Sequence, residues 1–564
     1  MRLILISFLA LFLIQCGKVT GGSAASSTST NYDTTSIKLK FDSPCAPPTS
    51  AIKASATIVE IGKIGAVPTV FQVKSFADDG PGSLRAAVAA AKAGDTLYFD
   101  PSLAKDTIHL VKELVLSKSI ILDATTAVGL TLDGGNAVRI LSVNSNVSLT
   151  VTGITFINGR AVKVGNGGDE TGGAISTGNA CMLKISQCHF NHNVADCGGA
   201  VRAGYGTFTT IEDCSFLAND GSGANNGFSA GGISTNGHGE LIVRRCDFVQ
   251  NKGNSGAAIY NLLQPITIED CSIVGNISNN DGAAIFTDEG NWVGPGATKG
   301  GHILVRRCWM EANQSKAFGG ACMLWANPLD TVQIENSVFK NNAVAKGGKW
   351  GDSKGGAIRG NGILTIRNCA FVNNKAEAQG GALWLDGNGP VNIVNTLFTE
   401  NTVTDDQGGA ITFNTGGIVN VINCTIAKNH AGRACGGFWF GNPDLPITIS
   451  NSIVAFNTAG QDHGQDQVGY QPKDGGGNLE FPAPVGNGKK VAAGSLVQDP
   501  LLDSLSQING MLVLPIKTGS PAISLANKTR APADDQTLKL RDANPDAGAW
   551  EFTSNVTTGI HCPQ

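Results

Sequence analysis

The sequence predicts an all-β protein that folds as a single-stranded right-handed parallel β-helix, with three strands in each rung and a helical cap at the N-terminal end. Three observations support this fold class. A nine-residue stretch recurs ten times, a Gly-Gly-Ala signature lies between the copies, and glycine accounts for 73 of the 564 residues. Glycine weakens helix interiors, whereas short alternating runs between glycine and asparagine are typical of strands.

The recurrent stretch appears as "IEDCSFLAN" at 211–219 and again as "IEDCSIVGN" at 268–276. The second signature appears as "GGAIS" at 172 and "GGAVR" at 198. No piece of this length buries its apolar face alone, but three strands per rung of ~26 residues, stacked rung on rung, bury a continuous core. Parallel crossovers predict the right-handed turn. Each of the ten copies closes on an asparagine: Asn193, Asn219, Asn251, Asn276, Asn313, Asn342, Asn374, Asn401, Asn429 and Asn457.

Within one rung, the alternation places Ile211, Cys214 and Phe216 inside the coil and Asn219 at a turn. Asparagine tolerates the left-handed backbone conformation and bonds to nearby backbone. We therefore expect the asparagines to adopt that conformation and to stack into a ladder along the coil.

Two acids and a cysteine stand side by side in this stretch, which raises the question of a metal or catalytic cluster. Glu212 and Asp213 become Arg244 and Arg245 one rung later, so we expect solvated corner positions. Zinc needs four ligands that converge on a point, whereas the cysteines of successive copies form a line. We expect buried thiols there. Disulfides between adjacent rungs are the alternative, although side chains in parallel register do not point at one another.

The N-terminus predicts export. Residues 1–16 carry an apolar run too short to span a bilayer, as in a signal peptide, and "LIQC" resembles a bacterial lipobox in which Cys16 is lipidated. An ordinary signal peptide with an incidental cysteine is the alternative. Residues 17–66 are rich in Gly, Ser and Thr and predict a flexible linker. We expect a Gram-negative outer-membrane or cell-surface lipoprotein, held to the membrane through its lipid anchor.

The remaining chain divides into an N-terminal cap with the first rungs at 67–146, the repeats at 147–460, a C-terminal region at 461–552 and a tail at 553–564. In the cap, Ser83 can start a helix that Gly94 ends. "DDGPGSLRAAVAAAKAGDTLYFDPSLAKDTIHL" resembles the cap of bacterial secreted β-helix proteins. The GGA[IV] and FxxN repeats resemble the polymorphic outer-membrane protein family, and "DGGGNL", "DPLL", "GSPAI" and "PDAGAWE" resemble a choice-of-anchor domain. These resemblances imply a pectin-lyase-like fold and a surface location, and they leave the activity open.

A candidate binding surface follows the Gly-Gly-Ala strand. The residues that alternation turns outward there include aromatic side chains among polar ones, a mixture typical of ligand sites. The alternative is that long loops cover these rings, which then form a satellite core. The substrate-binding candidates are Arg202, Tyr260, Phe286, Trp325 and Trp384.

Catalytic candidates on the same surface are Asp288, Glu289, Asp386 and Arg359. Paired carboxylates serve glycoside hydrolysis. A lysine or arginine base beside calcium-binding acids serves β-elimination from uronates, and Ca²⁺ is expected only in that case. No pattern predicts a resident metal site or another cofactor.

The sequence favours a binding or adhesion protein for polysaccharide or cell-surface glycan, without catalysis. A polysaccharide lyase or glycoside hydrolase acting in a groove on the β-helix is the alternative, and a passive stalk is a third possibility. The net charge of −4 and the lack of a basic stripe argue against a nucleic-acid partner.

Overall fold

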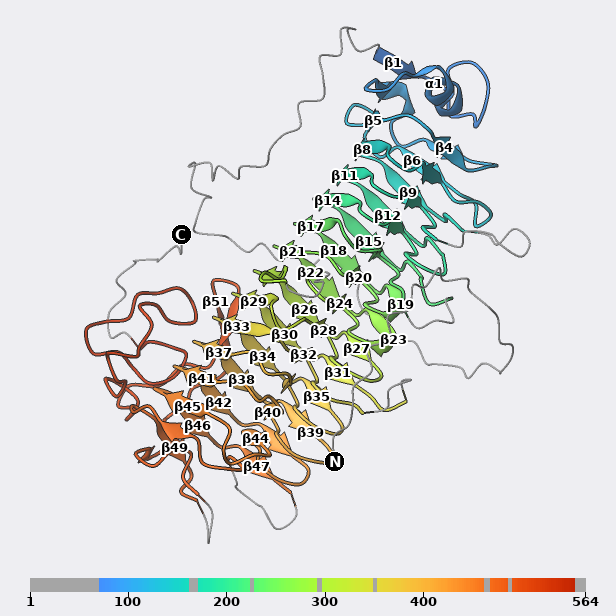
Figure 1. The fold of residues 1–564 in the computed structure, drawn as a ribbon. Helices are drawn as coiled ribbons and strands as arrows, with labels where there is room; N and C mark the ends of the chain where they lie inside the picture. The colour runs from blue at the N-terminus through green and yellow to red at the C-terminus, as the bar shows by residue number, and fades with distance from the viewer. Residues whose placement is uncertain are drawn as a thin grey trace, which may run out of the picture.

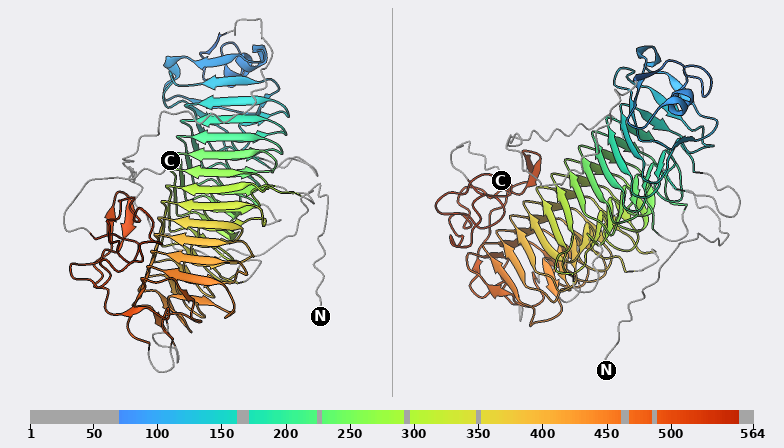
Figure 2. Two further views of the ribbon diagram at one scale, coloured as in Figure 1. Left: turned by 60° about the vertical axis from the view of Figure 1, so that its left-hand side comes forward. Right: turned by 45° about the horizontal axis from the view of Figure 1, so that its top comes forward.

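The computed structural model describes residues 70–161, 171–223, 228–291, 297–347, 352–460, 467–484 and 489–552. Cys16, the predicted signal peptide, the whole predicted linker and the tail after residue 552 lie outside these ranges. The described residues form a parallel β-helix of about 14 turns, as the sequence predicts. Its strands stack one above another along a single axis (Figure 1, Figure 2).

Sheet A contains the alternating strand that precedes each cysteine position, and all 15 of its strands pair in parallel. Its strands, in order, are β1 (Val70–Val73), β2 (Thr96–Phe99), β5 (Ile120–Asp123), β8 (Ser148–Thr152), β11 (Met182–Ser186), β14 (Phe208–Glu212), β17 (Glu240–Arg244), β21 (Ile266–Glu269), β25 (His302–Arg306), β29 (Thr331–Glu335), β33 (Ile363–Arg367), β37 (Val391–Val394), β41 (Val419–Ile422), β45 (Ile447–Ser450) and β48 (Lys473–Asp474).

Sheet B contains the strand that follows each cysteine position. Its strands are β3 (Thr107–His109), β6 (Thr131–Asp133), β9 (Thr155–Ile157), β12 (His189–Asn191), β15 (Ser215–Leu217), β18 (Asp247–Val249), β22 (Ser272–Val274), β26 (Trp309–Glu311), β30 (Val338–Lys340), β34 (Ala370–Val372), β38 (Leu397–Thr399), β42 (Thr425–Ala427), β46 (Ile453–Ala455), β49 (Leu479–Phe481) and β50 (Leu496–Val497).

Sheet C contains the strand of the Gly-Gly-Ala signature. Its strands are β4 (Leu114–Leu116), β7 (Leu141–Val143), β10 (Ile175–Thr177), β13 (Val201–Ala203), β16 (Ile233–Thr235), β20 (Ile259–Leu262), β24 (Ile285–Asp288), β28 (Cys322–Trp325), β32 (Ile358–Gly360), β36 (Leu383–Leu385), β40 (Ile411–Phe413) and β44 (Phe438–Phe440).

Sheet D is an addition to the predicted three strands per rung. It follows the ladder asparagine in the second half of the coil. Most of its strands have two residues, too few for a readable alternation. They are β19 (Lys252–Ser255), β23 (Ile277–Asp281), β27 (Gln314–Ser315), β31 (Ala343–Val344), β35 (Lys375–Ala376), β39 (Thr402–Val403), β43 (His430–Ala431) and β47 (Thr458–Ala459).

The N-terminal end carries the cap helix α1 (Leu84–Ala90), beside β1 at the top of Figure 1. The Ser83 hydroxyl accepts a hydrogen bond from the Ala86 backbone N–H, and Leu84 and Val88 are buried. The helix ends at Ala90, four residues before the predicted stop at Gly94. A 3₁₀ turn, η1 (Pro101–Leu103), follows β2. No helix among the described residues is long and apolar enough to cross a membrane.

The asparagine ladder is present and completely buried, with its ten members inside the coil. Asn276 shows the pattern, because its side-chain amide donates to the Asn313 side-chain oxygen of the next rung (3.0 Å) and to the Phe248 carbonyl of the previous one (3.0 Å). The expected left-handed conformation was placed one residue too late. It belongs to the residue before each asparagine, for example Ala218, Gln250 and Gly275.

Residues 211–219 are a structural unit. Ile211, Cys214 and Phe216 are buried. Asp213 adopts the left-handed conformation at the corner between sheets A and B. Its carboxylate accepts two hydrogen bonds from Arg245 (2.7 and 3.0 Å), the residue that replaces it one rung later. None of the described cysteines forms a disulfide.

The C-terminal region extends the coil and then folds back on it. Strands β48 to β50 continue sheets A and B. Residues 499–552, with the antiparallel pair β51 (Ser506–Ile508) and β52 (Met511–Val513), form a lobe beside the coil (Figure 1, Figure 2). Met511 and Val513 pack against outward-facing residues of sheet B, including Val338 and Leu397. The lobe therefore covers the outer face of sheet B in the second half of the coil.

Candidate functional site

Most of the predicted aromatic residues on sheet C are covered. Their positions follow from the register, in which Tyr260 pairs with Phe286 and Phe286 with Met323 on successive rungs. Tyr260 is 7% exposed and Phe286 is 5% exposed, and their stacked rings (5.2 Å) pack against Phe228 and Phe318. These two rings form a satellite core, so we no longer assign them to substrate binding.

Arg202 is half-buried and lies four rungs before the rung of Met323. At about 4.8 Å per rung it is roughly 19 Å from Trp325 along the axis. Its guanidinium donates to the Ala203 carbonyl. The structure therefore does not bring Arg202 together with Trp325, although it lies two rungs before Tyr260.

Arg359 is the centre of the cluster that the structure does assemble. Its guanidinium carbon lies 4.3 Å from the ring centroid of Phe318, 4.8 Å from that of Trp325 and 5.1 Å from that of Trp384. A guanidinium this close to aromatic faces is held by cation–π attraction. Arg359 also donates to the Asp386 carboxylate at 2.9 Å, and both side chains are largely buried.

The exposed ring of this cluster is Trp325, at 37% exposure against 6% for Trp384. It pairs in register with Asp288 on the preceding rung. Asn361 and Asp386, on the next two rungs, follow the paired residues Gly360 and Leu385. We call Asp288, Trp325, Asn361 and Asp386 the Trp325 row. It runs along the coil axis with one outward residue per rung, at a spacing of about 4.8 Å.

The four catalytic candidates do not converge. Asp288 and Asp386 stand three rungs apart, about 14 Å along the axis, whereas glycoside hydrolysis needs carboxylates within roughly 5 to 9.5 Å of each other. Arg359, the candidate base, is tied to Asp386. Glu289 follows β24 in the left-handed conformation. Burial raises the pKa of Asp288 and of Glu289, and Asp288 raises the pKa of Glu289 further.

Asp281 belongs to the same cluster, although the sequence did not single it out. It ends β23 in sheet D, is almost completely buried, and has a side-chain oxygen with no hydrogen-bond partner in the described structure. Burial raises its pKa to about 6, against the opposing effects of Arg359 and of the Phe318 backbone N–H. Asp281 could not be found from the sequence, because β23, the strand that contains it, was not predicted.

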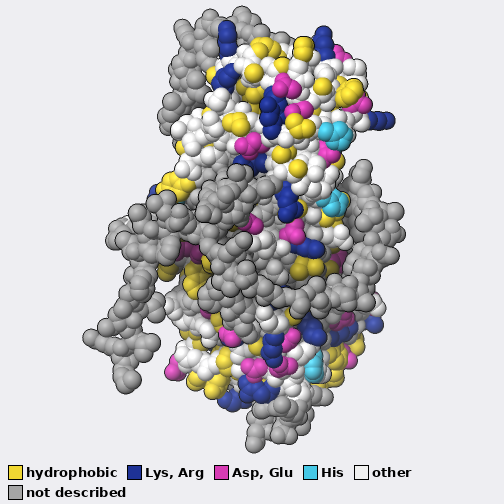
Figure 3. Space-filling model, turned by 90° about the vertical axis from the view of Figure 1, so that its right-hand side faces the viewer, with side chains coloured by type: hydrophobic (Ala, Val, Ile, Leu, Met, Phe, Trp, Pro, Cys, Tyr) yellow, Lys and Arg dark blue, Asp and Glu magenta, His cyan; other side chains and the backbone are white. Residues whose placement is uncertain are grey.

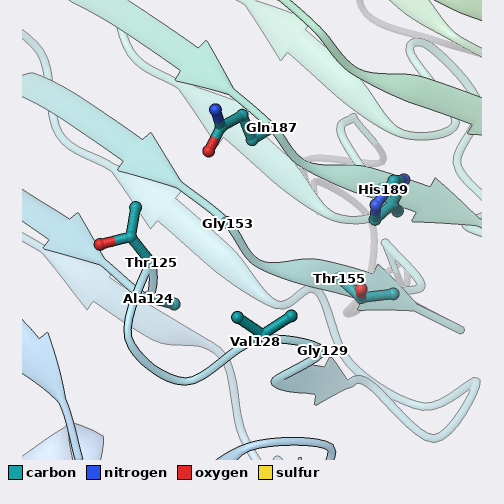
Figure 4. A pocket seen from close by; sticks show the side chains of 8 residues that line it. All are labelled: Ala124, Thr125, Val128, Gly129, Gly153, Thr155, Gln187 and His189. Atoms are coloured by element: carbon teal, nitrogen blue, oxygen red, sulfur yellow. The ribbon is translucent and has the colours of Figure 1, made fainter. Parts of the chain in front are cut away.

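Two hollows in the described surface lie away from the Trp325 row. One of about 300 Å³ lies where sheets A and B meet (Figure 4). Thr125 and Val128 border it from the loop after β5, and His189 borders it from β12. Another, of about 240 Å³, lies in the C-terminal lobe beside Lys528 and Arg541. Neither contains a predicted site residue.

Neither the charge distribution nor the arrangement of metal-ligating residues indicates a second candidate site among the described residues. On the face in Figure 3, basic and acidic side chains are interspersed rather than gathered by sign. Within the described ranges, no group of three or more His, Cys, Asp or Glu residues could hold a metal ion. The Ca²⁺ expected for a lyase stays a prediction of that alternative.

No family model matches the sequence, and no curated protein matches it either. Solved structures similar to this chain include pectate lyase Pel9A, at 14% identity and a TM-score of 0.26, with 87% of this chain and 98% of that one covered. Another is alginate lyase AlyF-OU02, solved as a complex, at 11% identity and a TM-score of 0.29, with coverage of 82% and 93%. At these TM-scores neither likeness bears on function, and the β-helix of this chain rests on its own strand register.

Proposed function

We propose that this chain is a polysaccharide-binding β-helix protein that holds a glycan along the Trp325 row and does not cleave it. The observation that carries this is the position of Trp325, a solvent-facing ring on a rigid strand. Asp288 occupies the same column one rung before it and Asp386 two rungs after it, whereas Asn361 between Trp325 and Asp386 is 8% exposed and accepts a hydrogen bond from the Ala326 backbone N–H (2.6 Å). An aromatic ring flanked by a few polar groups is a typical ligand-binding arrangement. Because the row follows the axis, it suits a chain of sugars better than a single one.

Catalysis is the alternative that the geometry supports less well. A lyase needs a base free to take a proton, and Arg359 is held by an ion pair and three rings. A hydrolase needs two carboxylates near one bond, and Asp288 and Asp386 are about 14 Å apart. Of the acids closer to Asp288, Asp330 is completely buried and bonded to backbone N–H groups, so only the adjacent Asp288 and Glu289 keep a hydrolase as the alternative.

We also propose that the protein is exported and anchored at the outer membrane or cell surface through lipidated Cys16. The lipobox-like "LIQC" supports the anchor, and the choice-of-anchor and polymorphic outer-membrane resemblances support the surface location. Replacing Cys16 by Ser should move the protein from the membrane fraction to the soluble fraction and abolish incorporation of labelled palmitate. Membrane retention of the variant would contradict the anchor.

Trp325→Ala tests the binding site. Removing the exposed ring should weaken polysaccharide binding at least tenfold in affinity electrophoresis or calorimetry, because the stacking face is lost. Phe76→Ala is the matched control, since Phe76 is an exposed ring of the N-terminal cap, 64% accessible and many rungs from the Trp325 row. It should bind as the wild type does. If the Trp325→Ala variant binds polysaccharide as tightly as the wild type, the Trp325 row is not the binding site. If the wild type itself binds no polysaccharide, a passive stalk is favoured.

A further inference from the structure

The charges around the Trp325 row are mostly negative. Among the described residues, the two cations closest to its rings each have a carboxylate partner, and a third cation, Lys299, is exposed on the segment whose Gly301 N–H donates to Asp330. Arg359 pairs with Asp386 at 2.9 Å. Lys354, whose ammonium lies 5.0 Å from the Trp384 ring centroid, pairs with Asp352 at 3.0 Å.

Further acids add to this without an ion-pair partner among the described residues. No described cation pairs with Asp288, which occupies the rung before Trp325, or with its neighbour Glu289. Asp330 is completely buried beside them, and its carboxylate accepts hydrogen bonds from the backbone N–H groups of Gly290 (2.7 Å) and Gly301 (2.6 Å). Asp281, on the far side of Arg359, places a fourth carboxyl in the same region.

These acids already repel one another. The negative charges of Asp288 and Asp330 both raise the pKa of Glu289. Like charges placed close together in a partly buried setting cost more than in bulk water, because the effective dielectric constant is lower. A ligand that brought another carboxylate or a sulfate to Trp325 would increase this repulsion.

The hydrogen-bonding groups of the site also favour a ligand that brings no further negative charge. Ionised carboxylates accept hydrogen bonds and donate none, so this end of the row offers acceptors to a ligand. Sugar hydroxyl and amino groups supply matching donors. A uronate carboxylate supplies further acceptors.

We infer that the glycan held along the Trp325 row is one without acidic groups, built from neutral or amino sugars rather than uronates or sulfated sugars. This rests on the proposed function, because it names the chemistry of a ligand for that same site. The discrimination is electrostatic, so it weakens as ionic strength rises.

The test uses one polymer in two charge states: polygalacturonate and the same preparation with its carboxyl groups chemically reduced to alcohols. The full-length protein should bind the reduced polymer at least tenfold more tightly at low salt, and the ratio should shrink in about 0.5 M NaCl. Equal or tighter binding of the acidic polymer would overturn the inference and leave the proposed function standing. Binding of neither polymer, nor of any neutral or amino-sugar polymer, would overturn both.

Variants assign the effect to the named residues. The Asp288→Asn, Glu289→Gln double variant should reduce the preference for the uncharged polymer several-fold, because two negative charges beside Trp325 are removed. The matched control is Asp444→Asn, Glu400→Gln. Glu400 also stands in the left-handed conformation, both control residues are exposed, and neither lies in the Trp325 row. If both double variants change the preference for the uncharged polymer equally, the effect cannot be assigned to Asp288 and Glu289.

Discussion

At the scale of single residues, Arg359 connects the interior of the cluster to its surface. Its guanidinium is stacked among three rings and bonded to Asp386, while its Nε has no hydrogen-bond partner in the described structure. It contacts the Trp325 ring, which is still 37% exposed. Truncating Arg359 would therefore disturb both the ring and the Asp386 carboxylate, so it is a poor first probe of ligand binding.

Asp281 allows a cleaner experiment. Its pKa is raised by burial from 3.8 to about 6. A carboxyl that holds its proton more tightly when folded stabilises the protein fully below pH 3.8, and this contribution is lost as the pH rises through about 6. The complete loss corresponds to roughly 3 kcal/mol. Asp281→Asn removes the ionisation, so the variant should unfold at a higher temperature than the wild type near pH 8 and at a similar temperature near pH 4.

The measurement is the difference in thermal midpoint between the two proteins across that pH range. Asp444→Asn, at an exposed position, is the control and should show no such trend. A difference for Asp281→Asn that does not change with pH would contradict the assigned ionisation.

The sequence identified most members of this cluster but not which of their faces are accessible. Alternation alone placed Tyr260, Phe286 and Trp325 on one outward face, and the register agrees. Whether an outward ring is exposed depends on the segment that crosses it. Tyr260 and Phe286 lie beneath Phe228 and Phe318, which stand in segments without a regular period.

At the scale of elements, the asparagine ladder is the structural feature most open to a quantitative test. Asn313→Ala would remove the donor to the Ile273 carbonyl (2.8 Å) and the acceptor of both Asn276 donors. Buried groups left without partners cost about 1–3 kcal/mol each, so we expect the variant to lose roughly 3 kcal/mol or more of stability. Asn144→Ala, at an exposed turn, is the control and should lose little.

Denaturant unfolding followed by circular dichroism would measure this. A loss below about 1 kcal/mol for Asn313→Ala would mean that the ladder bonds are replaced by water or by relaxation of the rung.

The ladder was predictable because its asparagines recur in every repeat of the sequence. The backbone conformation of these asparagines was not predictable. The asparagine side chain is needed inside the coil to bond to both neighbouring rungs. The turn is therefore made by the preceding residue, whatever its type, including Ala218 and Gln250. Sheet D escaped prediction because two-residue strands show no alternation. The parallel register that pairs each rung with the next followed directly from the repeat.

At the scale of the whole molecule, the C-terminal lobe is locked by a buried ion pair. Arg541 donates to Glu551 at 2.7 Å, with side chains 2% and 0% exposed. Arg541 also donates to Asn395 of the coil at 3.1 Å. Arg541→Leu would leave Glu551 charged and uncompensated, which costs about 3–5 kcal/mol for a buried pair. The lobe should then be cleaved from the coil by protease faster than in the wild type.

A second change separates charge from packing. Arg541→Leu with Glu551→Leu removes both charges, and replacing a buried pair by apolar residues is often close to neutral. The double variant should regain part of the protease resistance. No recovery would show that the other hydrogen bonds of Arg541, rather than the charge of Glu551, hold the lobe. The sequence placed a separate region here but carried no signal for its docking, since contacts such as Arg541 to Asn395 depend on the folded coil.

The central claim is that the molecule holds a non-acidic glycan along its axis without cutting it. The most direct measurement is mass spectrometry of a defined neutral oligosaccharide that the protein binds, recovered after prolonged incubation at stoichiometric concentration, with and without Ca²⁺. The account predicts an oligosaccharide of unchanged length and mass that competes with polysaccharide for the wild type and not for Trp325→Ala. Shortened products that disappear in Asp386→Asn would contradict it and establish a hydrolase, and unsaturated products formed from polygalacturonate under the same conditions would contradict it and establish a lyase.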